Sequence, residues 1–215
     1  MIYSPPLLPM AARAAPVLTY VGTVGPTTIG GASSYTWSAA SIGAAATGRL
    51  VVVCVAGNNV AFGVSSATIG GVAATVVSVQ QGQYMGSAIL TAVVPTGTTA
   101  NVAVTFTGGI GTGFIGIWNI TGLASSTAHD FYNTTGGVNG TYTATLDVPA
   151  LGVAVAFGAG FSGGASSTWT GGTERFDYDN ASVNYTGSDF TTATLVTNKT
   201  MQATNVQFVN AASWA

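Results

Sequence analysis

Leu50-Val51-Val52-Val53-Cys54-Val55-Ala56-Gly57 is the longest apolar run in the chain that has the composition of a β-strand. Its β-branched residues suit a pleated surface, because their stiff side chains lose little freedom there. An apolar run without alternation is typical of a strand covered on both faces. Its short length and the flanking segments Gly48-Arg49 and Asn58-Asn59 argue against a helix. We therefore predict a central strand of a packed β-domain.

A second run of the same kind, Leu151–Gly158, begins 101 residues later. At this offset, 15 of 57 positions are identical between Leu50–Phe106 and Leu151–Gln207. Composition alone would give about six identities, so the excess favours a duplicated β-unit over shared turn and strand composition. The matched positions include the loop glycine pairs Gly70-Gly71 and Gly171-Gly172.

The rest of the chain has short strand-like segments separated by turn signals and no segment with helical periodicity. This pattern predicts an all-β fold, a β-sandwich or jelly roll built from two similar units that form one sandwich or two adjoining ones. A turn is expected at Gly25-Pro26, and a strand at Asp189–Val196. The predicted divisions are an extended proline-rich arm at 1–16, a first β-unit at 17–123, a connector at 124–140 and a second β-unit at 141–215.

Charge is scarce, with four basic and six acidic residues giving a net charge of -2. Without a basic patch the chain is a poor candidate for binding nucleic acid, since neutralising phosphates supplies most of that affinity. No stretch approaches 18 consecutive apolar residues, which excludes a spanning helix, and we expect no membrane partner. So few charges protect a monomer poorly against self-association, which favours a protein that lives in an assembly, as a homo-oligomer.

The first sixteen residues are apolar and interrupted by Pro5, Pro6 and Pro9, which disfavour helix and sheet. An extended arm with so many large apolar side chains is expected to dock on a partner; the alternative is that it folds back over its own sandwich. No basic segment precedes an uninterrupted apolar one, so we expect synthesis in the cytoplasm followed by assembly rather than export. The predicted docking residues are Ile2, Tyr3, Leu7, Leu8 and Met10.

Chemically active side chains are few. A single histidine, His129, and a single cysteine, Cys54, are too few for a zinc site, and one cysteine forms no intrachain disulfide. Glu174, Asp177 and Asp179 are the one acidic cluster, either a Ca²⁺ site or a solvated strand end, of which we favour the strand end. No base, nucleophile and orienting group fall at a recognisable spacing, so we predict no catalytic residue, no cofactor and no enzymatic activity.

Aromatic side chains admit two interpretations, as core residues or as a sugar-binding face on which rings stack. Core residues are the more common case, and we favour that interpretation. The residues concerned are Trp37, Trp118, Trp169, Trp214, Tyr35, Tyr84, Tyr132, Tyr178 and Tyr185.

Four segments carry a resemblance to a known class of proteins: Gly48-Arg49-Leu50-Val51-Val52, Ala67-Thr68-Ile69-Gly70-Gly71-Val72-Ala73-Ala74-Thr75, Val93-Val94-Pro95-Thr96-Gly97-Thr98-Thr99-Ala100 and Ser167-Thr168-Trp169-Thr170-Gly171-Gly172-Thr173-Glu174. They resemble strands of small β-sandwich proteins of tailed-bacteriophage virions. This resemblance implies a structural role in capsid decoration, a head fibre or a tail, with capsid or tail proteins of the particle as partners, a homo-oligomer such as a trimer, location in the virion, and no catalytic residue. The alternative is a carbohydrate-binding or host-attachment module of a tail fibre or a secreted adhesin.

Overall fold

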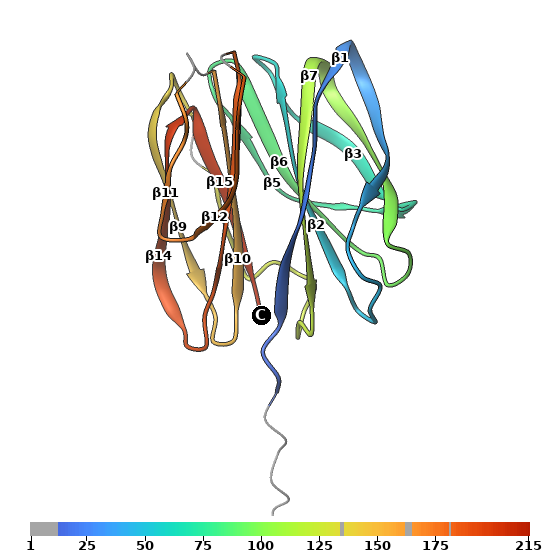
Figure 1. The fold of residues 1–215 in the computed structure, drawn as a ribbon, viewed down its shortest axis with the longest axis vertical. Helices are drawn as coiled ribbons and strands as arrows, with labels where there is room; N and C mark the ends of the chain where they lie inside the picture. Colours follow the sequence, from blue (N-terminus) through green and yellow to red (C-terminus); the bar gives the residue numbers. More distant parts are fainter. Residues whose placement is uncertain (1–12, 134–135, 162–164, 181) are drawn as a thin grey trace, which may run out of the picture.

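The computed structural model describes residues 13–133, 136–161, 165–180 and 182–215. Within these residues the chain forms strands and no helix, which confirms the predicted all-β class (Figure 1). In chain order the strands are β1 (Val17–Ser41), β2 (Leu50–Asn58), β3 (Val64–Ile69), β4 (Val72–Ala73), β5 (Thr75–Gln81), β6 (Met85–Val93), β7 (Thr99–Thr121), β8 (Asp130–Asn133), β9 (Gly140–Val148), β10 (Val153–Gly160), β11 (Trp169–Thr170), β12 (Thr173–Asp179), β13 (Asn184–Thr191), β14 (Val196–Val206) and β15 (Phe208–Trp214).

The first unit is a sandwich made by two long strands that bend from one layer into the other. The first part of β7 pairs with β3 and with the end of β1, and its last part pairs with β2 and with the start of β1. An inner sheet therefore runs in the order β5-β6-β2-β7-β1, and an outer layer runs in the order β4-β3-β7-β1. Register shifts along β1, for example between Val24 and Thr27, accompany the bend.

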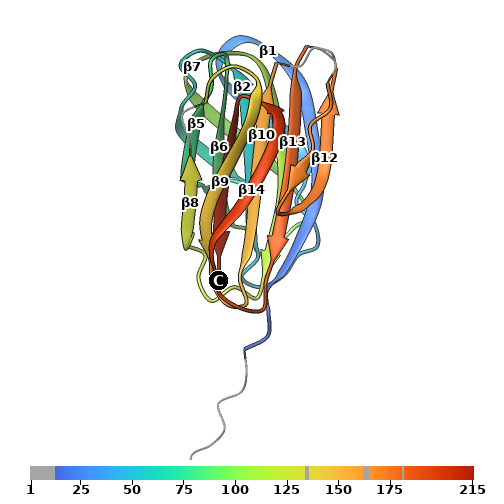
Figure 2. The same ribbon diagram turned by 90° about the vertical axis from the view of Figure 1, so that its left-hand side faces the viewer.

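The second unit repeats this strand order. Its inner sheet is β12-β13-β10-β15-β8 and its outer sheet is β11-β14-β9, and Figure 2 shows the outer sheet lying over the inner one. Two successive strands, β14 and β15, take the places that the single strand β7 takes in the first unit, and Gln207 is the break between them. In the same way β8 and β9 correspond to the two parts of β1. The two similar units predicted from the sequence are therefore present as two adjoining sandwiches.

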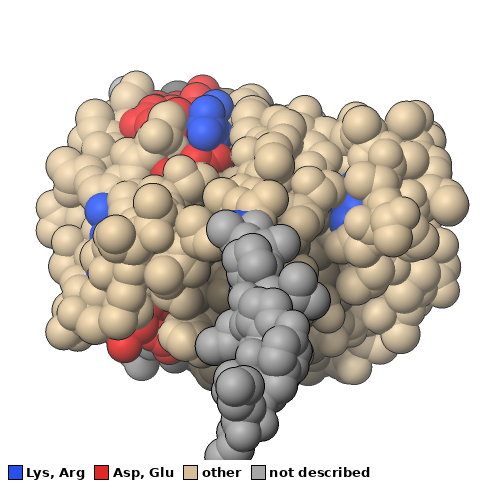
Figure 3. Space-filling model, turned by 90° about the horizontal axis from the view of Figure 1, so that it is seen from below, with Lys and Arg blue, Asp and Glu red and all other residues tan. Residues whose placement is uncertain are grey.

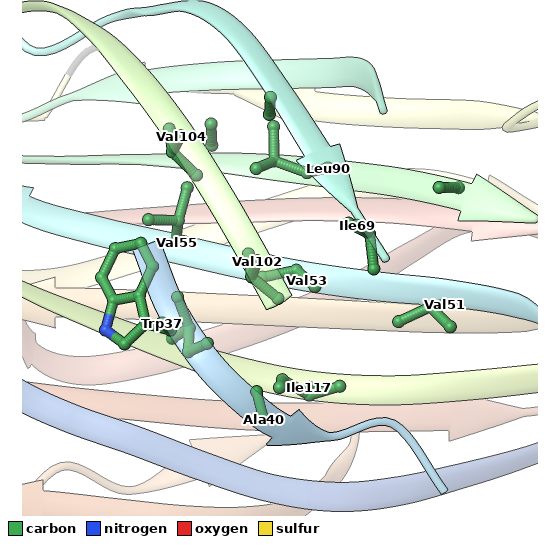
Figure 4. Packing of buried hydrophobic residues seen from close by; sticks show 14 of the residues in the cluster. Trp37, Ala40, Val51, Val53, Val55, Ile69, Leu90, Val102, Val104 and Ile117 are labelled. Carbon is green, nitrogen blue, oxygen red and sulfur yellow. The ribbon is translucent and has the colours of Figure 1, made fainter. Parts of the chain in front are cut away.

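Three apolar cores separate the four layers. The first-unit core lies inside the first sandwich (Figure 4), the second-unit core lies inside the second, and the middle core joins the two inner sheets. The inner sheets are thus covered on both faces. Representative members are Trp37, Val53 and Ile117 for the first-unit core, Cys54, Trp118, Val155 and Trp214 for the middle core, and Ala154, Leu146 and Met201 for the second-unit core.

The central-strand prediction for Leu50–Gly57 is confirmed. β2 lies between β6 and β7, and its residues from Leu50 to Gly57 are buried. Val51, Val53 and Val55 face the first-unit core, whereas Val52 and Cys54 face the middle core. Apolar and polar residues do not alternate in this strand because neither of its faces meets water.

The ungapped offset of 101 residues does not hold along the whole repeat. It matches Cys54 to Val155, and both face the middle core from the central strand of their sheet. It also matches Gly86 to Gly187, but Gly86 lies against Phe62 of the first-unit core and Gly187 against Phe176 and Trp118 on the middle-core side. A slip of one residue reverses the face of a strand, so these two positions are not equivalent.

Three local expectations are wrong or incomplete. The turn expected at Gly25-Pro26 lies inside β1, which continues through it. The strand expected at Asp189–Val196 ends at Thr191 and belongs to β13. The segment 124–140, expected as a connector, contains β8, which pairs with β15 at the edge of the second inner sheet.

Arg49 is fully buried and has no carboxylate partner among the described residues. Its guanidinium group instead donates to backbone carbonyl groups of the β1–β2 and β6–β7 loops, which it holds together beside the start of β2. The acceptors are Val94 O at 2.8 Å from Nε, Gly43 O and Ala44 O at 2.7 Å from Nη1, and Thr96 O and Gly97 O at 2.9 Å and 3.0 Å from Nη2.

Replacing this group should destabilise the fold strongly. We expect Arg49→Ala to lower the free energy of unfolding by about 3 kcal/mol, because several buried carbonyl groups lose their donor. Arg49→Lys should recover part of that loss, since an ammonium group offers three donors without the planar geometry. Urea denaturation followed by tryptophan fluorescence measures both. A loss below about 0.5 kcal/mol for Arg49→Ala, the size of an ordinary surface substitution, would show that water replaces the guanidinium group.

Candidate docking site

The base of the arm is fixed at one end of the body. The described chain begins at Arg13, whose Nη2 donates to Gly122 O at 3.0 Å, and Pro16 is buried immediately before β1. Figure 1 shows this stretch leaving the body at the end where the carboxyl terminus also lies, which we call the lower end. The predicted docking residues Ile2, Tyr3, Leu7, Leu8 and Met10 lie outside the described residues.

The lower end carries a recess between the two units. We call it the lower recess; its volume is about 320 Å³, and it opens between the ends of β5 and β6 and the segment that leads into β8. Phe131 is 52% exposed beside it, and Val93 is partly exposed as well. Figure 3, seen from this end, shows a mostly uncharged surface with a few separate acidic and basic patches. The lining includes Leu50, Val77, Thr91, Val93, Ala128 and Phe131.

A second recess of about 460 Å³ lies at the opposite, upper end, again where the two units meet. Tyr84 precedes β6 and Phe161 follows β10, and their rings meet edge to face with centroids 5.6 Å apart. Both remain accessible, with exposed fractions of 47% and 38%. We call this the upper recess, and it is lined by Gln83, Tyr84, Val138, Asn139, Phe161 and Gln207.

Amide groups frame the aromatic pair of the upper recess. Asn139 holds Phe161 in place, because its side chain accepts from Phe161 N and donates to Phe161 O. Gln207, the break between β14 and β15, is almost fully buried, and its Oε1 accepts from Tyr84 N at 3.0 Å. Gln83 Nε2 donates to the Tyr84 hydroxyl at 3.0 Å. In the sequence Tyr84 is one of several aromatic residues, and no local pattern distinguishes it from Tyr185, which is buried.

The acidic cluster does not form a cation site in the described structure. Among the residues described, no group of three or more His, Cys, Asp or Glu side chains is placed to hold a metal ion. Glu174 accepts from Trp169 N, and Asp177 Oδ2 accepts from Ser167 N at 3.0 Å. The other oxygen of Asp177 is buried without a hydrogen bond to the described residues. Burial raises the pKa of Asp177, the hydrogen bond from Ser167 lowers it, and the nearby charges of Glu174 and Asp179 raise it further.

The raised pKa of Asp177 predicts the direction in which the stability of the protein changes with pH. Because the folded-state pKa of Asp177 lies above the unfolded value, the folded protein binds more protons between the two values, and stability falls as pH rises through that window. The full penalty is present above the folded-state pKa. We expect Asp177→Asn to be more stable than the wild type at pH 7, with the difference shrinking toward pH 3, in denaturation curves recorded at both values. An equal difference in stability between the two proteins at pH 7 and pH 3 would show that the titration of Asp177 is not its cause.

A buried polar group joins the two units through the middle core. Asp189 of β13 accepts from Trp118 Nε1 of β7 at 3.0 Å, and Arg175 Nε and Nη2 donate to its two oxygens at 2.7 Å and 2.8 Å. Asp189 is 2% exposed, whereas the Arg175 side chain is 37% exposed. A second connection runs through Asn210 of β15, which contacts Ser78 and Ser87 of the first unit. Nothing in the spacing of these residues in the sequence indicates that they meet.

Breaking the first connection should loosen the contact between the units. We expect Asp189→Asn to lower the free energy of unfolding by about 1–3 kcal/mol, since the buried Trp118 and Arg175 donors compete for one remaining acceptor. Arg175→Ala should cost more, because it leaves the Asp189 carboxylate, which is 2% exposed, buried without its cationic partner. Guanidinium chloride denaturation of the three proteins compares them. An equal or smaller loss for Arg175→Ala would contradict the assigned role of the Arg175–Asp189 pair.

Most of the remaining candidate residues lie in the core or are hydrogen-bonded within the fold. Cys54 is buried in β2, where desolvation raises its thiol pKa, and His129 is an exposed loop residue that donates its backbone N–H to Ser213 O. Trp37, Trp118 and Trp214 are core residues, as the favoured interpretation predicted. The fourth indole, Trp169, is partly buried and donates Nε1 to Thr186 Oγ1 at 2.7 Å. The tryptophans therefore form no exposed stacking face.

Comparison with known proteins identifies no family. No protein-family pattern matches the chain, and no curated protein is significantly similar to it. One solved structure, dimeric latent PorU from Porphyromonas gingivalis, aligns with 90% of this chain at 9% identity and a TM-score of 0.29. The aligned part is 20% of the PorU chain, and at this score the likeness supports no conclusion. The described residues contain no helix that could cross a membrane.

Proposed function

We propose that this chain is a non-enzymatic structural protein of a tailed-bacteriophage virion, a capsid decoration or head-fibre component that docks through its N-terminal arm. The observation that carries the proposal is the placement of the arm. Its base is held to the body by Arg13 and Pro16 at the lower end, directly after residues 1–12 in the sequence. The partners on this proposal are capsid or tail proteins of the same particle.

The hydrogen bonds of three buried polar side chains in the body support the proposal. Arg49 is surrounded by carbonyl groups, Asp189 is held by Trp118 and Arg175, and Asn210 bonds across the middle core. These are the side chains that a buried active site would otherwise use, and each has a structural partner. A body fixed in this way, with apolar side chains at its ends and few charges, suits repeated packing against neighbours.

The alternative of a carbohydrate-binding or host-attachment module has less support. Stacking on sugars needs exposed rings, and the four indoles considered for it are buried or partly buried. Of the five tyrosines considered with them, Tyr84 alone is exposed. We therefore favour the proposal of a role in assembly over glycan recognition.

Deleting residues 2–12 tests the proposed function. The described contacts of Arg13 and Pro16 are retained in this variant, so it should fold and unfold like the full chain in circular dichroism. Its incorporation into particles should fall by at least about tenfold, which corresponds to the loss of one well-buried apolar anchor. Mass spectrometry of particles purified from cells producing either chain measures the occupancy. Absence of the full chain from particles would reject the virion assignment, and equal occupancy of both chains would reject docking through the arm.

A further inference from the structure

Exposed apolar side chains gather at the two ends of the body. Val17, Val93 and Phe131 lie toward the lower end, whereas Tyr84, Val138 and Phe161 lie at the upper end. The two levels are separated by the whole of β6, because Val93 pairs with Leu50 beside the arm base and Met85 follows Tyr84 directly. Nine strand residues span about 27 Å.

The upper recess has the chemistry of a site for proline-rich chain. Grooves that bind polyproline II segments are lined by aromatic rings, and they recognise prolines spaced as Pro-x-x-Pro. Tyr84 and Phe161 supply two accessible rings set at 78° to each other, and Val138 extends the apolar lining. The amide group of Gln207 is held at the floor by Tyr84 N, and the Gln83 amide lies at the rim, where donors can meet the carbonyl groups that such a segment leaves unpaired.

The arm of this chain contains a segment of that kind. Pro5 and Pro6 are followed by Leu7, Leu8 and Pro9, so that Pro6-Leu7-Leu8-Pro9 is a Pro-x-x-Pro sequence with two large apolar side chains inside it. Proline fixes its own φ near the polyproline II value, so the segment loses little conformational entropy when it binds. The segment carries no charge, and the described lining of the upper recess carries none either.

A chain cannot place this segment in its own upper recess. The four residues from Arg13 to Pro16 lead away from the body below β1 (Figure 1). The four residues from Pro9 to Ala12 that separate Leu8 from Arg13 span at most about 18 Å even when fully extended. The upper recess is farther from Arg13 than the length of β6, about 27 Å. The segment that fits the recess must therefore come from another copy.

We propose that the upper recess of one copy binds the Pro5–Pro9 segment of the arm of a second copy, which joins copies head to tail. This inference rests on the proposed role of the arm in docking and names its partner as a second copy of this chain. The contact is heterologous, since the surface that gives the arm differs from the surface that receives it, so that repetition forms a ring or an open filament. The lower recess lies within reach of the chain's own arm and is the competing site.

Sedimentation velocity of the full chain over a range of concentrations tests the inference. We expect oligomers whose dissociation constant rises at least about tenfold in Tyr84→Ala and in Phe161→Ala, because each ring is a main contact of the segment. Both side chains are partly exposed, so the variants should keep the wild-type thermal unfolding temperature. Phe131→Ala is the matched control, since it removes an exposed ring of the lower recess and should leave association unchanged.

Mixing two defective chains gives a sharper result. A chain with Leu7→Asp and Leu8→Asp lacks a competent arm, and a chain with Tyr84→Ala and Phe161→Ala lacks a competent recess, so each alone should be a monomer. Their mixture should form one-to-one dimers, because it still contains one intact arm and one intact recess. A mixture that stays monomeric, a full chain that is monomeric throughout, or association lost in Phe131→Ala but kept in Tyr84→Ala would overturn the inference. The particle occupancy of the arm deletion is measured separately, so the proposed function can fail or survive independently.

Discussion

The contact between the two inner sheets is the constraint on which the remaining structure depends. Because the middle core covers one face of each inner sheet and the sandwich cores cover the other, the strands at their centres meet no water. Any polar group placed there needs a partner inside the protein. Two hydrogen bonds across the contact meet this need and fix one unit against the other. One joins Asp189 to Trp118, and the second joins Asn210 to Ser78.

The sequence predicts those parts of the fold that depend on local composition. The unbroken apolar run of β2 indicates a strand buried on both faces, and the absence of helical periodicity indicates the all-β class. The second run at Leu151 indicates a repeated unit, whose strand order matches the first. These features can be predicted from the sequence because a strand buried on both faces loses its alternation of apolar and polar residues, whatever its partner strands are.

Other features depend on partners that are distant in the sequence and cannot be predicted locally. Gly25-Pro26 has the composition of a turn, yet β1 continues through it because β7 pairs with it on both sides of the bend. The offset that aligns Cys54 with Val155 is one residue out of phase at Gly187, since the pairing of β13 with β10 sets its face. The upper recess combines residues from four separate segments, and Tyr84 had no local signal that separated it from buried tyrosines. The arm residues lie outside the described part of the structure, so their role remains a prediction.

The scarcity of charge in this chain has a physical connection with its four-layer architecture. Arg49 is surrounded by loop carbonyl groups, and Arg175 is paired with Asp189, so two of the four basic residues already serve the body. Arg13 holds the base of the arm, and Lys199 lies 3.9 Å from the centre of the Phe190 ring. Each basic side chain therefore has an internal contact, and the recesses at the two ends of the body are lined by uncharged side chains. Recognition at such ends depends on shape and on the conformational stiffness of the ligand rather than on electrostatic attraction, which is the condition under which a proline-rich arm binds efficiently.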